Sequence, residues 1–222
     1  LAGDCSFGAD VPTSGQYGIS TDAAGEQWLV RGDHPIMPVH DIPLVGLTGQ
    51  LNVLAALALT EPYISDMAAA VDTIKAFNGL PHRCEVVANE NDIVWINDSK
   101  ATNVAAVIAA LQGIDRTIIL LLGGVYKGGS LATMVPIIEE KVRAVIVFGE
   151  AADVFVDALQ DHALVEQAAH LTEAVTLAKQ QALTGEAVLL SPACASFDMF
   201  DNYMHRGDTF RGAVQALHGG QA

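Results

Sequence analysis

The feature that most constrains this chain is a regular alternation of strand-like and helix-like segments from residue 84 onward. Strands are predicted at 84–89, 93–97, 117–122, 144–148, 164–167 and 187–190, and helices at 101–111, 131–141, 151–160, 171–183 and 208–217. The strands at 117–122 and 144–148 are apolar on both faces, which is typical of strands that helices cover on both sides. The alternation therefore predicts an α/β fold with a doubly wound, mostly parallel sheet.

The first 79 residues follow a different pattern, rich in Gly, Pro, Asp and Thr. Strands are predicted at 27–30 and 42–45, and helices at 51–60 and 65–77. Ser65 or Asp66 is the expected N-cap of the second helix, because short polar side chains bond the free N–H groups there. Since Leu80-Pro81 resembles a linker, we predict two domains, residues 1–79 and 80–222.

The composition limits the partners that the chain can have. Lys and Arg number 11 against 26 Asp and Glu, and the net charge of −15 disfavours nucleic acid and anionic membranes. No apolar run approaches the ~20 residues of a membrane span. The three cysteines and seven histidines have neither disulfide nor zinc-site spacing, which favours a reducing cytoplasm. The chain starts at Leu1 without Met, so we interpret it as a fragment of a longer polypeptide.

The stretch Asn97–Asn103 places a carboxylate, a hydroxyl and a lysine where a strand gives way to a helix. Open α/β sheets bind ligands at that edge, and a helix N-terminus favours anions. Asp98 and Ser99 can instead be simple N-caps. Lys100 favours the binding interpretation, because a cation in the first turn of a helix opposes the helix dipole unless an anion is near.

Three more polar clusters occur at similar places, and each has an ordinary alternative. Arg83 follows the linker and could reach a phosphate across a cleft, or could pair with Glu85 at the surface. Lys127 projects from a Gly-rich turn after a strand, where it binds an anion or is merely solvated. Ser196 follows the last strand, where it bonds a carboxylate or caps the next helix. Cys194 is expected to be a buried apolar residue rather than a nucleophile.

Together these motifs resemble the Mur ligases, the ATP-dependent amide ligases of peptidoglycan synthesis, and most closely the branch that adds D-glutamate. The resemblance covers residues 44–218 and is carried by Gly79–Arg83, Asn97–Asn103, Leu122–Gly124 with Lys127, and Ser191–Ser196. It implies that residues 1–79 are the tail of the central ATPase α/β domain. Residues 80–222 correspond to the C-terminal Rossmann-like domain, which binds the amino acid.

The resemblance also implies a reaction and a set of site residues. Full-length enzymes use ATP and Mg²⁺ to join D-glutamate to UDP-N-acetylmuramoyl-L-alanine through an acyl phosphate, as cytoplasmic monomers in cell wall biogenesis, cell shape and cell division. This fragment lacks the P-loop, so it should be inactive alone and require no cofactor itself. The implied catalytic residues are Lys100 and Arg83; the nucleotide contacts are Asn52, Arg83, Asp98 and Lys100; and the D-glutamate contacts are Thr102, Lys127, Ser196, Phe197 and Tyr203.

Two departures from the family pattern stand out. The family has Gly-x-His-Asn-x-x-Asn before the Leu-Ala-Ala helix, whereas here Gly49-Gln50-Leu51-Asn52 precedes it. This pattern predicts that three residues, including the His-Asn pair, are absent, through a deletion or through an interruption of the chain between Gln50 and Leu51. The Lys127 loop also lacks the usual Asp-Phe.

Two other functions stay open at this point. The chain could belong to another Mur ligase or a folylpolyglutamate synthase, or it could be a non-enzymatic Rossmann-like binding domain. The string Ser191–Asp198 favours the D-glutamate branch, because the diaminopimelate and lysine ligases usually carry another recognition motif.

Overall fold

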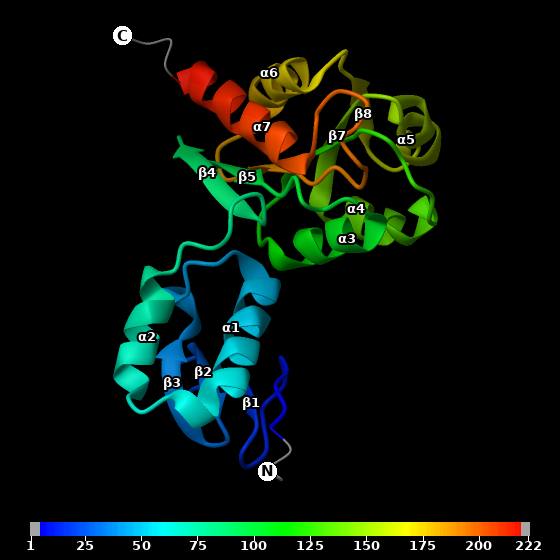
Figure 1. Ribbon diagram of the computed structural model, residues 1–222. Helices are drawn as coiled ribbons and strands as arrows, with labels where there is room; N and C mark the ends of the chain where they lie inside the picture. The colour runs from blue at the N-terminus through cyan, green and yellow to red at the C-terminus, as the bar shows by residue number, and fades with distance from the viewer. Residues whose placement is uncertain (1–4, 219–222) are drawn as a thin grey trace. The chain divides into compact units, whose positions relative to one another are not determined.

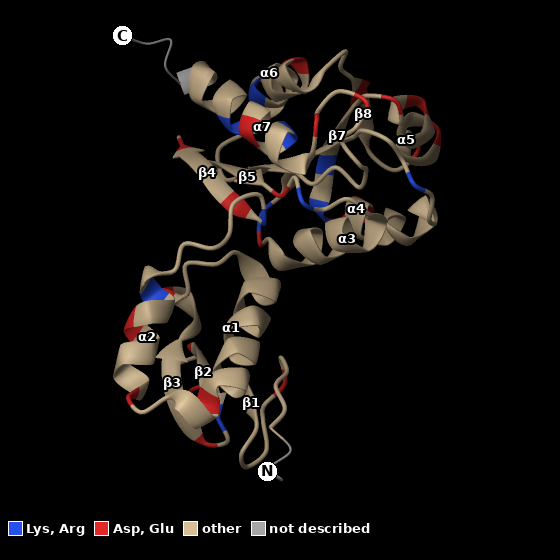
Figure 2. Ribbon diagram, viewed as in Figure 1, with Lys and Arg blue, Asp and Glu red and all other residues tan. Residues whose placement is uncertain are grey.

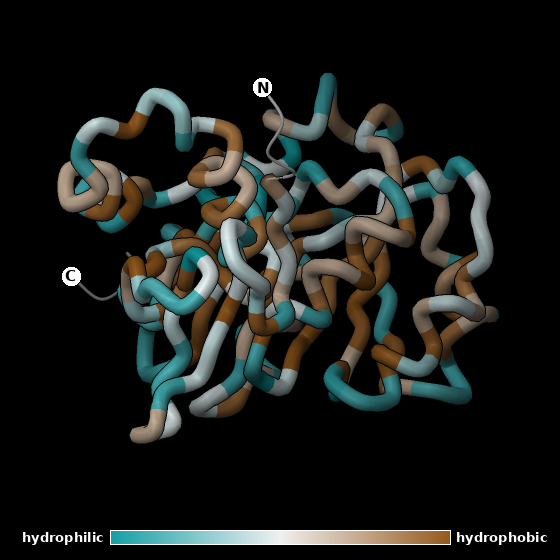
Figure 3. The backbone as a smooth tube through the Cα atoms, turned by 90° about the horizontal axis from the view of Figure 1, so that it is seen from below, coloured by the Kyte–Doolittle hydropathy of each residue, from teal (hydrophilic) through white to brown (hydrophobic). Residues whose placement is uncertain are grey.

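The computed structural model describes residues 5–218, and the chain divides into two compact units, residues 1–79 and residues 80–222 (Figure 1). Hydrophobic runs alternate with hydrophilic segments along the backbone (Figure 3). Among the described residues, no helix is both long enough and apolar enough to cross a membrane.

The first unit is a three-stranded antiparallel sheet with two helices. Its strands are β1 (Tyr17–Thr21), β2 (Gln27–Arg31) and β3 (His34–Pro38), and its helices are α1 (Gly46–Thr60) and α2 (Met67–Ala76). Short 3₁₀ turns lie at Val39–Asp41 and Glu61–Tyr63. The core joins sheet and helices through buried residues that include Tyr17, Leu29, Met37, Leu54 and Leu57. Asp66 is the N-cap of α2 and accepts the N–H groups of Ala68 and Ala69, as the sequence predicted.

Two predictions for the first unit are wrong. The predicted strand at 42–45 does not form, because Ile42 ends a 3₁₀ turn and Pro43 has no N–H to donate to a ladder. The predicted interruption between Gln50 and Leu51 does not occur either, since α1 runs through both residues. The family motif fits this continuous helix when its first glycine is Gly46 rather than Gly49, because Gly46 and Asn52 are six positions apart, as the two ends of the motif are. Thr48 and Gly49 occupy its His-Asn positions by substitution, with no residue deleted.

The second unit has the predicted alternating order. Its strands are β4 (Glu85–Glu90), β5 (Ile93–Asn97), β6 (Ile118–Gly123), β7 (Val142–Phe148), β8 (Leu164–Gln167) and β9 (Ala187–Leu190). Its helices are α3 (Val104–Gly113), α4 (Val135–Lys141), α5 (Ala152–Leu159), α6 (Leu171–Gln181) and α7 (Tyr203–His218), with a 3₁₀ turn at Leu131–Thr133.

The sheet of the second unit has the order β4-β5-β9-β6-β7-β8 and is parallel except for β4. Helices α6 and α7 cover one face, where Trp95, Leu121 and Phe148 meet Val175 and Phe210 in the core. Helices α3 and α4 lie on the other face (Figure 1). The predicted doubly wound, mostly parallel α/β fold is therefore confirmed.

Strand β4 runs antiparallel because a tight hairpin joins it to β5. Asn91 and Asp92 form this turn with φ angles of 54° and 59°. Such left-handed angles are tolerated by Asn and Asp and match the twist of a two-residue hairpin. The hairpin makes β4 an edge strand and leaves β5 free to pair with β9.

Candidate functional site

The sheet order brings three loops together at the carboxyl ends of neighbouring strands. Strand β9 pairs with β5 on one side and with β6 on the other, all in parallel. Thr102 follows β5, Ser196 follows β9 and Lys127 follows β6. Carboxyl ends of parallel strands share one edge, which is where open α/β sheets bind ligands.

The turn Asp98–Lys100 after β5 does not cap the next helix. The N-cap of α3 is Asn103, whose side chain accepts the N–H of Ala106 at 3.0 Å. The alternative that Asp98 or Ser99 caps this helix is therefore wrong. Lys100 also precedes the cap, so the prediction that it lies in the first helical turn is wrong as well. No Lys, Arg, Asp or Glu lies in α3 (Figure 2), so any charge here comes from the turn before it.

Asp98 is almost fully buried and is held by two donors. Its carboxylate accepts the hydroxyl of Ser191 at 2.9 Å and the N–H of Cys84 at 3.2 Å. Burial outweighs these bonds and raises the pKa of Asp98 from 3.8 to about 6. The two bonds orient the carboxylate toward the turn that precedes β4 and the loop that follows β9.

Arg206 is fully buried at the start of α7 and ties the three loops together. Its guanidinium donates to the Ser99 hydroxyl at 3.0 Å and to the Ser99 carbonyl at 2.9 Å. It also donates to the carbonyls of Gly123 at 3.2 Å and Cys194 at 3.0 Å. Burial lowers its pKa to about 10. Arg206 therefore fixes the loops after β5, β6 and β9 with one planar group.

Gly123 and Gly124 allow the loop after β6 to lie against its neighbours. Their φ angles are 154° and 126°. A Cβ atom at Gly123 would come within 2.1 Å of the Phe148 carbonyl, and one at Gly124 within 2.1 Å of the Ala195 carbonyl. Both positions therefore require glycine, because the backbone of neighbouring loops lies where a side chain would begin.

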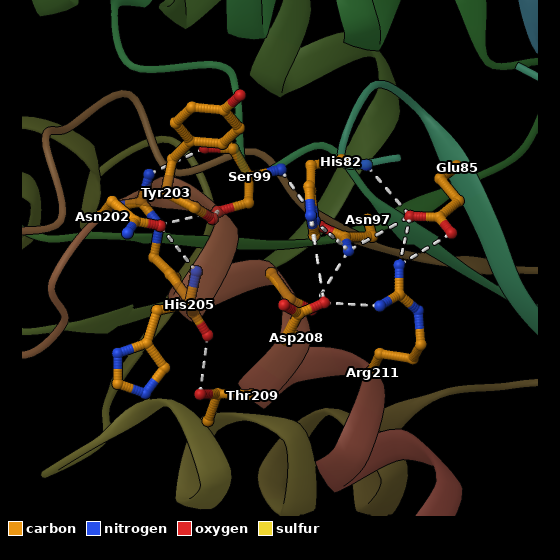
Figure 4. A network of polar contacts seen from close by, with 12 residues as sticks. His82, Glu85, Asn97, Ser99, Asn202, Tyr203, His205, Asp208, Thr209 and Arg211 are labelled. Atoms are coloured by element: carbon orange, nitrogen blue, oxygen red, sulfur yellow. Dashed lines mark hydrogen bonds and ion pairs between the residues drawn. The ribbon is translucent and has the colours of Figure 1, made fainter. Parts of the chain in front are cut away.

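A second polar network surrounds His82, which is buried before β4 (Figure 4). The His82 ring accepts the Asn97 side-chain N–H at 3.1 Å, and Asn97 also donates to the Gly207 carbonyl. The His82 carbonyl accepts the N–H of Lys100 at 3.1 Å. The Tyr203 ring meets His82 edge-on at 5.9 Å and lies 4.0 Å from the Lys100 Nζ. Lys100 and Tyr203, expected on different ligands, are thus in contact.

The other predicted site residues differ in exposure. Arg83, Lys127 and Phe197 are exposed, Thr102 is half-buried and Ser196 is buried. The alternative pairing of Arg83 with Glu85 is wrong, because Glu85 pairs with Arg211 at 2.8 Å. The alternative that Ser196 caps the next helix is also wrong, because α7 begins only at Tyr203. Asn52 lies exposed on α1, in the first unit.

Sequence reasoning did not find the roles of Arg206, Asn97 and Ser191. The scarcity of Arg made Arg206 notable, but its bonds reach residues far away in the chain, which no spacing reveals. Asn97 ends a strand that is otherwise apolar, and a polar residue there was the available signal. Cys194 is fully buried with its pKa raised to about 12 by burial, which matches the predicted apolar role.

Sequence and structure comparisons agree on one family. Residues 82–194 match the family described as Mur ligase, glutamate ligase domain. The UDP-N-acetylmuramoylalanine–D-glutamate ligase of Methylobacillus flagellatus is 45% identical over 213 residues, which are 95% of this chain and 47% of that protein. The Legionella pneumophila (strain Paris) ligase of the same name is 40% identical over 96% of this chain and 48% of its own length. The chain thus spans about half the length of these relatives.

Solved structures share the fold at lower identity. The UDP-N-acetylmuramate-alanine ligase of Thermotoga maritima has a TM-score of 0.64 at 16% identity, covering 97% of this chain and 49% of that one. A folylpolyglutamate synthase of Mycobacterium tuberculosis, solved with ADP and AMPPCP, has a TM-score of 0.60 at 17% identity, covering 91% of this chain and 48% of that one.

Fold and site together define a Rossmann-like α/β unit whose candidate ligand edge is formed by the loops after β5, β9 and β6. The family match covers most of this unit, and the relatives are similar along nearly the whole chain. The chain belongs to the Mur ligase family.

Proposed function

We propose that this chain is the C-terminal half of an ATP-dependent ligase that adds D-glutamate to UDP-N-acetylmuramoyl-L-alanine in peptidoglycan synthesis. The observation that carries the proposal is the junction of β5, β9 and β6, where Asp98, Thr102, Lys127 and Ser196 follow adjacent strands. The 40–45% identity to D-glutamate ligases along nearly the whole chain supports this substrate over those of the fold relatives. Residues 1–79 would complete the central ATP-binding domain.

The reaction needs positioning and charge stabilisation rather than covalent chemistry by the protein. ATP transfers its γ-phosphoryl group to the substrate carboxylate, forming an acyl phosphate and ADP. The amino group of D-glutamate then attacks the acyl carbon, the bond to phosphate breaks, and the nitrogen loses a proton to solvent. Two negatively charged partners must therefore be brought together, and cations of the chain can offset their charge.

We assign the nucleotide to the side of the site that carries Arg83, Asp98 and Lys100. The exposed Arg83 can reach phosphates, the Asp98 carboxylate can accept ribose hydroxyls, and Lys100 can neutralise charge that develops on the transferred group. Asn52 on α1 would contact the base. Thr48 and Gly49 stand where the family motif has His-Asn, so we expect fewer side-chain contacts from α1 to the nucleotide.

We assign D-glutamate to Thr102, Lys127, Ser196, Phe197 and Tyr203. The exposed ammonium of Lys127 suits the side-chain carboxylate, and the hydroxyls of Thr102 and Ser196 can donate to carboxylate oxygens.

Mg²⁺ would accompany ATP. Residues 5–218 contain no group of three His, Cys, Asp or Glu that could hold a metal ion, so no residue of the described chain is assigned to it. We assign the ligase to the cytoplasm, because it would depend on ATP and because Cys5, Cys84 and Cys194 are free thiols, which a reducing compartment maintains.

Steady-state kinetics of the complete ligase test the proposal. Wild type should release ADP continuously only when D-glutamate is present, because the acyl phosphate must be consumed before the next turnover. It should discriminate strongly against D-alanine, which leaves Lys127 unpaired. Lys127→Ala should raise the KM for D-glutamate about tenfold or more and leave the KM for ATP unchanged. Lys179→Ala removes a cation from the end of α6, which leads into the amino end of β9, and should change neither. An equal rise of both KM values with Lys127→Ala, or none, would contradict the assignment.

A further inference from the structure

The turn of residues 81–84 carries Arg83 between two residues with unusual backbone. His82 has a φ of 64° and Cys84 a φ of 44°. This left-handed region costs a residue other than glycine about 1–2 kcal/mol, and such angles persist only where the surroundings hold them. The side chain of Arg83 is exposed. Its direction therefore depends on what holds its two neighbours.

Two carboxylates hold these neighbours through their backbone amides. The N–H of His82 donates to Glu85 Oε2 at 3.0 Å, and the N–H of Cys84 donates to Asp98 Oδ1 at 3.2 Å. Asp98 is buried and is fixed further by Ser191. Glu85 lies at the start of the edge strand β4, with about a quarter of its side chain exposed, 23%. Asn97 Nδ2 also reaches Glu85 Oε2, but at 3.5 Å, the limit of a hydrogen bond, so a closer partner is needed to hold the carboxylate in place.

Arg211 supplies that partner from α7. Its Nη2 lies 2.8 Å from both carboxylate oxygens of Glu85, and its Nη1 lies 2.6 Å from Asp208 Oδ1 (Figure 4). A guanidinium that reaches both oxygens of a carboxylate restricts the rotation of that carboxylate, because it is planar and carries several donors. The contact thus orients Glu85 toward the His82 amide.

We infer that Arg211 is a positioning residue, which acts through Glu85 and the strained turn to aim Arg83 at the nucleotide phosphates. The inference rests on the proposed function, because it takes Arg83 as a phosphate ligand. Arg211 itself touches no reacting group in this account. Its effect should therefore appear in nucleotide affinity and should require Arg83.

The first test replaces Arg211 with methionine in the complete ligase. Methionine keeps most of the packing of the side chain but has no donors. Arg211→Met should raise the KM for ATP about tenfold and leave kcat and the KM for D-glutamate within about twofold. Arg211→Lys should restore part of the affinity, because an ammonium pairs with Glu85 but orients it less.

A double variant separates positioning from general stability. Arg83→Ala alone should raise the KM for ATP, and adding Arg211→Met should raise it no further, because the residue that Arg211 aims is gone. Arg116→Met is the matched control. Arg116 is similarly exposed, 33% against 28% of the side chain, and pairs with Asp92 at the β4–β5 hairpin. It should leave the kinetics unchanged.

Each outcome decides the inference. If Arg211→Met behaves like Arg116→Met, or if it worsens the Arg83→Ala enzyme as much as wild type, the inference is wrong. If Arg211→Met does not fold, Glu85→Gln is tested in its place. The glutamine amide keeps an acceptor for the His82 N–H but loses the charge that pairs with Arg211. An unchanged KM for ATP in Glu85→Gln would overturn the inference. A wild-type enzyme that releases no ADP with D-glutamate would refute the proposed function, which is a separate result.

Discussion

The polar residues at the ligand edge fall into two sets that differ in burial. The buried set is Asp98, Ser99, Ser191 and Arg206, whose bonds are made within the protein. The exposed set is Arg83 and Lys127. Folding therefore determines the geometry of the buried set, whereas a ligand can still orient the exposed set. We expect substitutions in the buried set to affect stability first and those in the exposed set to affect substrate binding first.

The largest effect should follow from Arg206→Met. The variant leaves the carbonyls of Ser99, Gly123 and Cys194 without the donors that they now have. Each unpaired buried acceptor costs about 1–3 kcal/mol, so the free energy of unfolding should fall by roughly 3–5 kcal/mol in urea denaturation of the 222-residue chain. Arg83→Met should change it by less than about 0.5 kcal/mol. Equal losses would remove the distinction between the two sets.

A smaller effect should follow from Gly207→Ala in α7. A Cβ atom there would lie 2.2 Å from His82 Nδ1, so the buried network must shift, at a cost of about 1–3 kcal/mol. Gly212 lies in the same helix, and its Cβ would meet no atom within 4 Å. Gly212→Ala should therefore stabilise the chain by about 0.5–1 kcal/mol. Thermal unfolding of both variants measures the difference, and equal midpoints would contradict it.

The raised pKa of Asp98 predicts that Asp98→Asn makes the fold more stable at neutral pH but weakens nucleotide binding. Because the folded-state pKa of about 6 exceeds the usual 3.8, the folded protein binds more protons than the unfolded chain between these values. This contribution to stability is present below about pH 4 and is lost as the pH rises through 6. Asp98→Asn should thus add about 1–3 kcal/mol at pH 7.5 and little at pH 4, while the KM for ATP rises. A variant that is less stable at pH 7.5 would show that the charged form is favoured.

A small stability effect should follow from Lys100→Ala. Lys100 is half-buried, so it belongs to neither the buried nor the exposed set. Its Nζ lies 4.0 Å from the centre of the Tyr203 ring, a contact worth about 0.5–1 kcal/mol. The melting temperature should therefore stay near that of wild type, while the turnover of the complete ligase falls severely. A loss of several degrees with unchanged turnover would show that Lys100 serves the fold.

The fold was predictable because its main signals are local. Strands that are apolar on both faces, such as β6 and β7, appear in the sequence at their observed places. Strands β1 and β3 were not predicted, and α1 and α7 each begin about five residues before the predicted start. The antiparallel direction of β4 was missed, although Asn91-Asp92 is a two-residue turn signal. Pro43 could have excluded the false strand at 42–45.

The site was predictable only in part, for the same physical reason. Lys127 and Ser196 follow strands, and strand ends can be predicted from local patterns. The bonds of Arg206 to Ser99 and of Arg211 to Glu85 join residues more than a hundred positions apart. Local pattern carries no information on such pairs, because they depend on how α7 packs against the finished sheet.

The place of β9 has a consequence for how the protein is made. Among the described residues this strand is the last along the chain, yet it lies between β5 and β6 at the centre of the sheet. During translation, β5 and β6 emerge long before the strand that separates them, and their inner edges remain unpaired until β9 leaves the ribosome. Unpaired edges are templates for pairing with other chains. Synthesis that stalls before residue 187 should thus release a product prone to aggregation, and the loops after β5, β9 and β6 can come together only after residues 187–190 have appeared.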